Sequence, residues 1–285
     1  MRPEPLRSAA RAAGWPASAR VGAWMFAALL LAVVAIPILS SSSAWDGDYQ
    51  HGQMPDGRPI GPGAAHFLGT DRLLRDVLVR LALASAHSIE LTVLACTLTA
   101  SIALVLGCTA GYFEGRWLDR LMQVAIEIAL GFPAILLLMT VGSVVRRVDL
   151  AGMAALMAAV SWPWMTVTVR ARAAEVSRRD FIVGARALGA RDVHILWRHL
   201  LPNVMPLALR LVALTVAPMI LLETALAYVG VGCPPPVPTL GRMLYEGQDA
   251  ILGAPWLVLA PALVLTWIGV SATLLSNALV VERRS

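Results

Sequence analysis

The sequence contains no lysine, and all 23 of its basic residues are arginine. A P-loop nucleotide site needs a lysine to reach the phosphates, and Schiff-base catalysis needs a lysine amine. The absence of lysine therefore excludes an ordinary Walker A site and Schiff-base chemistry. We expect this chain to bind no cofactor.

Charged residues are scarce, at 14% of the 285 residues, which is about half the share usual in soluble domains. Hydrophobic residues make up 58%, and the mean hydropathy of +0.71 is too high for a surface that faces water on all sides. The composition predicts an all-α integral membrane protein. In such a protein the net charge of +5 reports orientation, so we expect membrane lipid and no nucleic acid as a partner.

Cysteine and histidine are also few, and they form no recognisable site. Cys96, Cys108 and Cys233 make no CxxC pair, and two of them lie in apolar runs, as buried thiols do. His194 and His199 are five residues apart, which aligns them poorly on an α-helix. No GxSxG nucleophile motif is present either. We therefore expect no metal site and no enzymatic activity in the chain itself.

Six apolar stretches are long enough to cross the hydrocarbon core as helices, which takes about 20 residues. They are Val21–Ser41, Ile89–Gly111, Leu121–Val145, Leu150–Val169, Leu207–Val229 and Trp256–Val280. The first stretch resembles a signal peptide, but its apolar core is long and no clear cleavage site follows, so we expect it to be retained. This predicts about six transmembrane helices: a first helix at 21–41 and a five-helix core at 89–281.

Arginine is distributed unevenly between the connecting segments. If the N-terminus is cytoplasmic, the inner segments hold 16 arginines and the outer segments hold 7. The positive-inside rule then predicts cytoplasmic tails at 1–20 and 282–285. It also places the long segment 42–88 outside. Within that segment, Asp71–Ala86 has leucine and valine at helical spacing, which predicts an amphipathic helix on the outer surface.

The long inner segment, Arg170–Pro206, carries apolar residues at helical spacing: Phe181, Ala185 and Leu188, then Val193, Leu196 and Trp197. Gly189 interrupts the pattern and predicts two short helices with a bend near Gly189-Ala190. Such a hairpin leaves an apolar face uncovered. It either lies along the membrane, where arginines contact anionic lipid, or docks into the groove of a partner protein.

The stretch from Phe181 to Ala190, followed by Arg198-His-Leu-Leu-Pro-Asn203, resembles the EAA loop of ABC importer permeases. In that family the loop is the coupling helix, which sits in a cleft of the cytoplasmic ATPase. Val183 stands where the family usually has Glu, and Gly184 stands where it has the first Ala. The resemblance implies an ATPase-coupling role for Phe181, Val183, Gly184, Ala185, Arg186, Ala187, Leu188, Gly189 and Ala190.

Three further stretches are similar to the "C" subunit of the dipeptide/oligopeptide/nickel branch of this family. The first is His66-Phe-Leu-Gly-Thr-Asp71 with Arg75-Asp76-Val77, where Leu74 replaces a usual Gly. The second is Asp119, Glu127 and Phe132-Pro133. The third is Glu223–Gly232 with Pro234–Pro238 and Gly241, where Leu240 replaces a frequent Trp.

The resemblance implies the type I ABC importer architecture in a bacterial inner membrane. The expected partners are a second permease subunit, two ATPase subunits that bind ATP and Mg, and an extracytoplasmic substrate-binding protein. Di- or oligopeptides are the commonest substrates of the branch, and nickel or a metal chelate is the alternative.

Three residues within the apolar stretches need a separate explanation. A carboxylate in hydrocarbon must face protein or a water-filled path, so Glu127 and Glu223 either line a translocation path or gate, or tie neighbouring helices together. Pro133 is expected to kink its span.

Two other function classes fit less well. An intramembrane enzyme needs paired catalytic groups, and the spans hold only isolated glutamates. An ATP-independent secondary transporter predicts an inverted repeat, which is not visible, and it leaves the hairpin unexplained.

Overall fold

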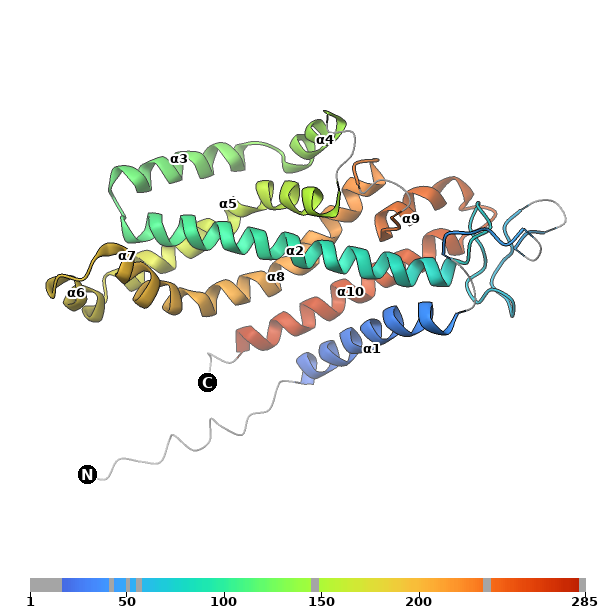
Figure 1. Cartoon of the computed structure of the whole chain (residues 1–285), viewed down its shortest axis with the longest axis horizontal. Helices are drawn as coiled ribbons and strands as arrows, with labels where there is room; N and C mark the ends of the chain where they lie inside the picture. The colour runs from blue at the N-terminus through green and yellow to red at the C-terminus, as the bar shows by residue number, and fades with distance from the viewer. Residues whose placement is uncertain are drawn as a thin grey trace, which may run out of the picture.

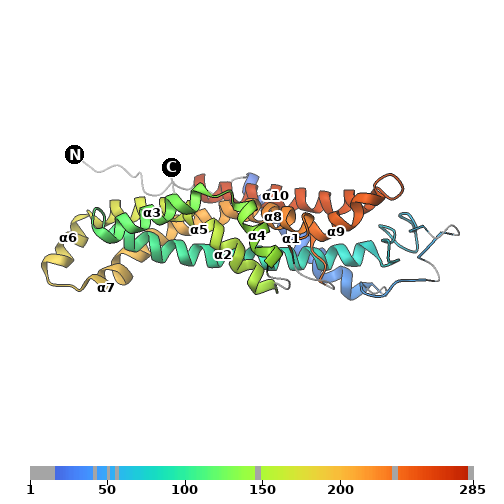
Figure 2. The same ribbon diagram turned by 90° about the horizontal axis from the view of Figure 1, so that it is seen from above.

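The computed structural model describes residues 17–40, 44–49, 52–54, 58–144, 149–232 and 237–281. These residues form an elongated bundle of helices, and their only β-structure is two isolated bridges. The long helices run close to the long axis of the molecule (Figures 1 and 2). The predicted all-α fold is confirmed. Residues 1–16 and 282–285 of the predicted tails, Cys233 and Pro234–Pro236 lie outside the described residues.

The helices follow one another along the chain, and the long segment 40–76 separates the first from the second. They are α1 (Ala17–Leu39), α2 (Val77–Tyr112), α3 (Trp117–Gly131), α4 (Ala134–Val144), α5 (Leu150–Ser177), α6 (Asp180–Ala187), α7 (Asp192–Ile195), α8 (Leu201–Tyr228), α9 (Leu240–Gly247) and α10 (Trp256–Val281). A π-helical turn at Leu196–Leu200 joins α7 to α8, and a 3-10 turn at Gln248–Ala250 follows α9. We call the end with α6 and α7 the hairpin end, and the opposite end, with residues 44–76, the loop end (Figure 1).

Five of these helices are long and apolar enough to cross a membrane, and a sixth span is obtained if the bent pair α3–α4 counts as one. This agrees with the prediction of about six spans. α3 and α4 meet at an angle of 79°. Pro133 lies in the gap between them, where it has no N–H to donate and forces Phe132 into an extended conformation. The predicted kink at Pro133 is confirmed.

The prediction of a separate amphipathic helix over Asp71–Ala86 is wrong. Residues 71–76 form a turn, and α2 then runs unbroken for 36 residues, a length of about 54 Å. The apolar side chains that suggested a surface helix, such as Val77 and Leu81, pack inside the protein with Leu240 and Leu257. Because α2 is much longer than the roughly 30 Å hydrocarbon core, it extends beyond the membrane.

Helices α2 and α5 pack closely because α2 presents small residues at four-residue spacing: Ala103, Gly107 and Gly111. A Cβ added at Gly107 would lie 2.6 Å from the Val169 side chain, and one added at Gly111 would overlap the Arg170 carbonyl oxygen. Small residues permit this approach between membrane helices, where no hydrophobic driving force pulls them together.

We expect Gly111→Ala to destabilise the protein by about 1–3 kcal/mol, because overpacking against the α5 backbone outweighs the better helix propensity of alanine. The measurement is the thermal unfolding midpoint of the purified protein in detergent. Gly269→Ala in α10 is the control, since its Cβ would have no atom of the described part of the chain within 4 Å. An equal effect of the two substitutions would contradict the close α2–α5 packing.

Candidate functional site

The hairpin end has the shape that the sequence predicts: two short helices with a bend at glycine. The backbone N–H of Leu188 donates to Gly184 O at 3.0 Å and closes α6. Gly189 follows with a φ of +81°, a conformation that side chains with a Cβ rarely adopt. The chain reverses there and begins α7 at Asp192, at the extremity of the molecule (Figure 1).

The hairpin has one apolar face against the bundle and another that is uncovered. Ile182, Ile195 and Leu200 are fully buried beside residues of α2 and α5. On the outside, large apolar side chains are exposed: Phe181, Val183, Leu188, Val193 and Trp197. The helical spacing in the sequence identified most of this outer face but missed the inner one. Each short helix and the turn after α7 contribute only one residue to the inner face, and single apolar residues do not form a detectable period in the sequence.

Small residues interrupt the outer face of α6. Gly184 and Ala187 are exposed, and a Cβ added at Gly184 would meet nothing within 4 Å. Glycine in the middle of a helix costs about 1 kcal/mol relative to alanine, and no contact among the residues that the structure describes requires it. A partner surface is therefore able to approach the α6 backbone closely at Gly184.

An ion pair between a buried carboxylate and a partly buried arginine holds α3 against α5 at the base of the hairpin. The Asp119 carboxylate, 1% exposed, accepts two hydrogen bonds from Arg170, from Nε at 2.6 Å and Nη2 at 2.9 Å. It also accepts from Gly115 N at 2.9 Å. Asp119 thus fixes both the turn after α2 and the position of α3.

The interpretation of His194 and His199 as poorly aligned is wrong. The π-helical turn at Leu196–Leu200 changes the register, and the two rings lie 5.7 Å apart between centroids. Two histidines alone do not make a metal centre, and the described residues contain no group of three potential ligands.

The other predicted site residues lie in three separate places. Glu127 is exposed on α3, and Pro133 occupies the α3–α4 bend. Glu223 on α8 is 1% exposed and accepts a hydrogen bond from Ser88 Oγ of α2 at 3.2 Å. Ser88 Oγ in turn accepts from Leu240 N at the start of α9 at 3.2 Å. Glu223 therefore ties α8, α2 and α9 together, and its role in a path stays a prediction.

At the loop end, the motif from His66 to Asp76 is a capping structure for α2. Asp76 Oδ1 accepts from Leu78 N and Val79 N, and its Oδ2 lies 2.8 Å from His66 Nδ1. Asp71 Oδ1 accepts from Arg75 N at 3.0 Å and closes the preceding turn. These contacts explain why histidine and two aspartates occur at this spacing.

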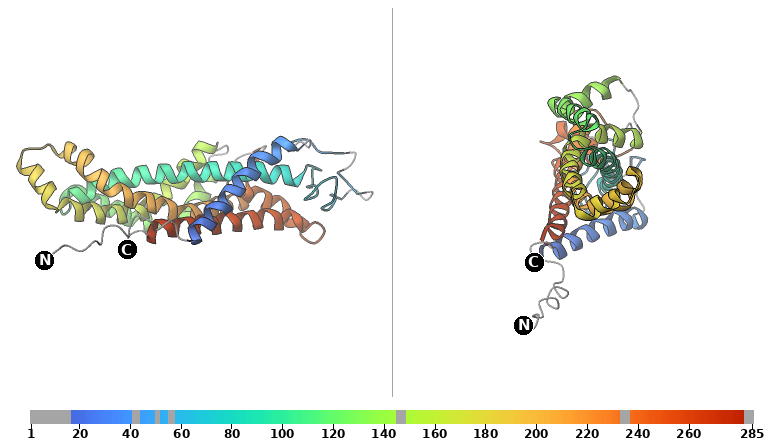
Figure 3. Two further views of the ribbon diagram at one scale, coloured as in Figure 1. Left: turned by 90° about the horizontal axis from the view of Figure 1, so that it is seen from below. Right: turned by 90° about the vertical axis from the view of Figure 1, so that its left-hand side faces the viewer.

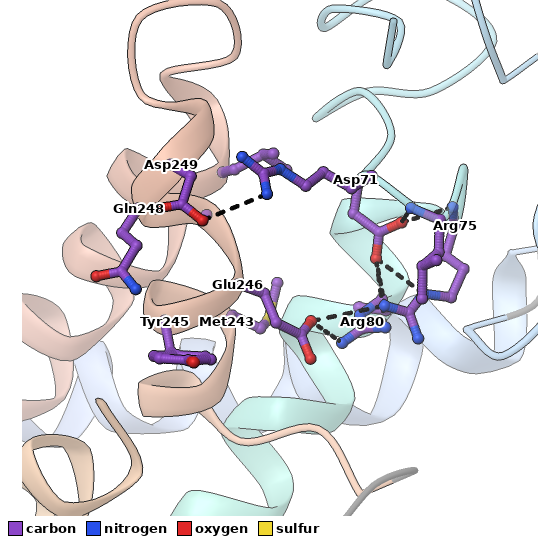
Figure 4. Close-up of a pocket in the computed structure, with 12 residues that line it drawn as sticks. Asp71, Arg75, Arg80, Met243, Tyr245, Glu246, Gln248 and Asp249 are labelled. Atoms are coloured by element: carbon purple, nitrogen blue, oxygen red, sulfur yellow. Dashed lines mark hydrogen bonds and ion pairs between the residues drawn. The ribbon is translucent and has the colours of Figure 1, made fainter. Parts of the chain in front are cut away.

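A cavity of about 300 Å³ beside this turn is lined by charged residues of both signs (Figure 4). Arg80 of α2, only 3% exposed, lies 3.3 Å from Asp71 and 2.9 Å from Glu246 of α9. Arg75 bridges the same two carboxylates. The cluster joins the loop end, α2 and α9, and sequence reasoning missed it because its members are up to 175 residues apart.

Leu74 has a φ of +60°, although it is not glycine. The left-handed conformation costs a residue with a Cβ about 1–2 kcal/mol. Leu74 is nevertheless buried, at 7% exposure, and burial of a leucine side chain contributes roughly 1.5–3 kcal/mol. Burial outweighs the strain, which explains why the chain tolerates leucine where its resemblance implies glycine.

We expect Leu74→Ala to lower the unfolding midpoint more than Leu74→Gly. Both substitutions lose the buried side chain, but glycine alone also removes about 1 kcal/mol or more of backbone strain. The thermal unfolding midpoints of the two variants in detergent test the order. An Ala variant as stable as the Gly variant would show that the φ of +60° carries no cost.

Comparison with known proteins identifies the family. Residues 103–284 match the family described as "Binding-protein-dependent transport system inner membrane component". The dipeptide transport system permease protein DppC of Alkalihalophilus pseudofirmus is 31% identical over 241 residues, covering 85% of this chain and 77% of that protein. The oligopeptide transport system permease protein OppC of Mycobacterium bovis is 32% identical, covering 89% and 86%. The glutathione transport system permease protein GsiD of Pectobacterium atrosepticum is 30% identical, covering 77% and 72%.

Among solved structures, a chain of the MetNI methionine ABC transporter in an inward-facing conformation has a similar fold. The TM-score is 0.55 at 18% sequence identity, covering 70% of this chain and 96% of that one. The fold is therefore that of a type I ABC importer permease. The chain belongs to the family of binding-protein-dependent transport system inner membrane components and is a multi-pass membrane permease of an ABC importer.

Proposed function

We propose that this chain is one of two permease subunits in a bacterial inner-membrane importer of di- or oligopeptides. Two partner ATPase subunits bind ATP and Mg, and an extracytoplasmic binding protein delivers the substrate. The observation that carries the proposal is the uncovered apolar face of the α6–α7 hairpin, held at one extremity of the bundle.

The position of the hairpin favours docking into a partner over lying along the membrane. Its inner face packs on the ends of α2 and α5, which are about 54 and 42 Å long and extend beyond the hydrocarbon core. In the end-on view of Figure 3, the hairpin faces the viewer at the tip of the bundle. An apolar face in that place is away from lipid and suits the cleft of a soluble ATPase.

The distribution of arginine supports an orientation of the chain in the membrane, and the names of the relatives support a class of substrate. The hairpin end carries Arg178, Arg179, Arg186, Arg191 and Arg198, and this excess of arginine favours a cytoplasmic location by the positive-inside rule. The names of the relatives include dipeptide, oligopeptide and glutathione permeases, so peptides are favoured over nickel or a metal chelate. Membership of a binding-protein-dependent family favours an ATP-driven importer over a secondary transporter.

Glu127 is the best candidate for the translocation path. Its side chain is exposed on a spanning helix, and a carboxylate there must face a second permease or water instead of lipid. Pro133 bends the span that carries Glu127 and so determines the direction of that span. Glu223, by contrast, is enclosed within this chain.

The test is affinity purification of the tagged chain in mild detergent after expression with its neighbouring genes. A stoichiometric complex with a second permease and ATPase subunits supports the proposal. A folded chain that purifies alone and transports a labelled peptide without ATP would overturn it.

A further inference from the structure

Tyr112, the last residue of α2, contacts both helices of the hairpin. Its hydroxyl donates to Asp192 Oδ1 at 2.6 Å, at the first position of α7. The guanidinium carbon of Arg186, in the last turn of α6, lies 5.0 Å from the centroid of the Tyr112 ring. Tyr112 is only 7% exposed, so its position is fixed by packing.

These two contacts are on opposite sides of the bend at Gly189. Arg186 precedes the glycine and Asp192 follows it, so a single side chain of α2 holds both arms of the hairpin. The phenol supplies a charge-assisted hydrogen bond to one arm and a cation–π contact to the other. The Phe113 ring packs edge-on against Tyr112, with 4.9 Å between centroids, and limits its rotation.

Tyr112 also connects the hairpin to the opposite end of the molecule. α2 is unbroken from Val77 to Tyr112, and near its other end Arg80 joins the Asp71–Glu246 cluster. A displacement of the hairpin that is transmitted to Tyr112 is therefore carried by one rigid helix to the loop end.

We infer that Tyr112 is a positioning residue that clamps α6 and α7 to α2 and makes α2 follow the hairpin when the partner ATPases move. The inference rests on the proposed function of the hairpin. It assigns the coupling within this chain to a residue outside the hairpin itself.

The first test measures the clamp in the isolated full chain, without partners. Tyr112→Phe removes the hydroxyl and keeps the ring. We expect amide hydrogen exchange across residues 180–195 to accelerate on the order of tenfold, the factor for losing one hydrogen bond to a charged acceptor. Exchange near Val77 should not change. Tyr228→Phe, on a half-exposed tyrosine of α8, is the matched control. Unchanged exchange across 180–195 would overturn the clamp.

The second test measures coupling in the assembled complex with its own binding protein and a casein hydrolysate as the peptide source. We expect Tyr112→Phe to keep the subunit stoichiometry and basal ATP hydrolysis but to lower stimulation by the binding protein about tenfold. Asp192→Ala, which removes the acceptor, should lower the stimulation by a similar factor, and the double variant should be no worse than either single variant.

The two ideas fail in different ways. Stimulation of Tyr112→Phe within twofold of the unaltered complex, or independent effects of the two substitutions that multiply, would overturn the coupling role of Tyr112. If the unaltered chain forms no complex with ATPase subunits, the proposed function is wrong, and so is the coupling role of Tyr112. The hydrogen-exchange experiment on the isolated chain still tests whether the clamp exists.

Discussion

Replacing Gly189 by arginine is expected to release the ATPase subunits from the purified complex and to reduce their recovery more than tenfold. Gly189 has a φ of +81°, so a residue with a Cβ costs about 1–2 kcal/mol in backbone strain. Beyond its two chain neighbours, none of the described residues lies within 4 Å of the added Cβ, so the side chain projects into the space where we place the partner cleft. A desolvated, unpaired charge in such an interface is far more costly than the strain.

Gly230→Arg is the matched control for this experiment. Gly230 has a φ of +90° and also has none of the described residues within 4 Å of an added Cβ, but it follows the C-terminal end of α8, away from the hairpin. The two variants therefore share the strain and the added charge. Recovery of ATPase subunits should fall for Gly189→Arg alone, measured against the recovered permease. Equal losses in both variants would mean that general destabilisation, and not hairpin docking, accounts for the result.

The features predicted correctly from the sequence are those with a local cause. Five long apolar helices follow from uninterrupted runs of apolar residues, and the bend at Gly189 follows from one glycine between two amphipathic stretches. The break at Pro133 follows from a missing N–H. Each of these causes acts within a few residues of its effect, so no knowledge of tertiary contacts is required.

The features that were missed depend on distant partners. Val77 and Leu81 have the spacing of a surface helix, but the presence of Leu240 and Leu257 beside them makes them part of the core and extends α2. The π-helical turn that brings His194 towards His199 has no sequence signature at this spacing. Periodicity in the sequence identifies which face of a helix is apolar. Whether protein, lipid or a partner covers that face depends on the tertiary contacts of the helix.

In the candidate site, too, the features with a local cause were predicted and those that depend on distant residues were missed. The outer apolar face of the hairpin was predicted because it has helical periodicity, and it is exposed in the structure, where we propose that a partner ATPase covers it. Tyr112 gave no signal, since it lies 80 residues before Asp192 and ends a span of ordinary appearance. The contacts of Tyr112 with both arms of the hairpin depend on its position in the fold, and that position becomes visible only in three dimensions.

Asp119→Leu is expected to lower the thermal unfolding midpoint by about 6–12 °C, because it leaves the Arg170 guanidinium without its buried partner. Breaking a buried pair by removing one member costs about 3 kcal/mol or more, and in a chain of this size each kcal/mol corresponds to roughly 2–4 °C. Glu175→Leu is the control: it removes a carboxylate that pairs with Arg172 and Arg179 on the exposed side of α5, and it should change the midpoint little.

The double variant Asp119→Leu/Arg170→Met separates two explanations of that loss. If most of the cost is the unpaired charge, an apolar pair of similar volume restores most of the stability, and the double variant is more stable than Asp119→Leu. If the double variant is as unstable as the two single losses added together, the ion pair itself provides the stability. The first outcome means that Asp119 and Arg170 mainly specify where α3 meets α5, which in turn fixes where α2 ends and where Tyr112 meets the hairpin. The second outcome would make the pair a source of stability in its own right.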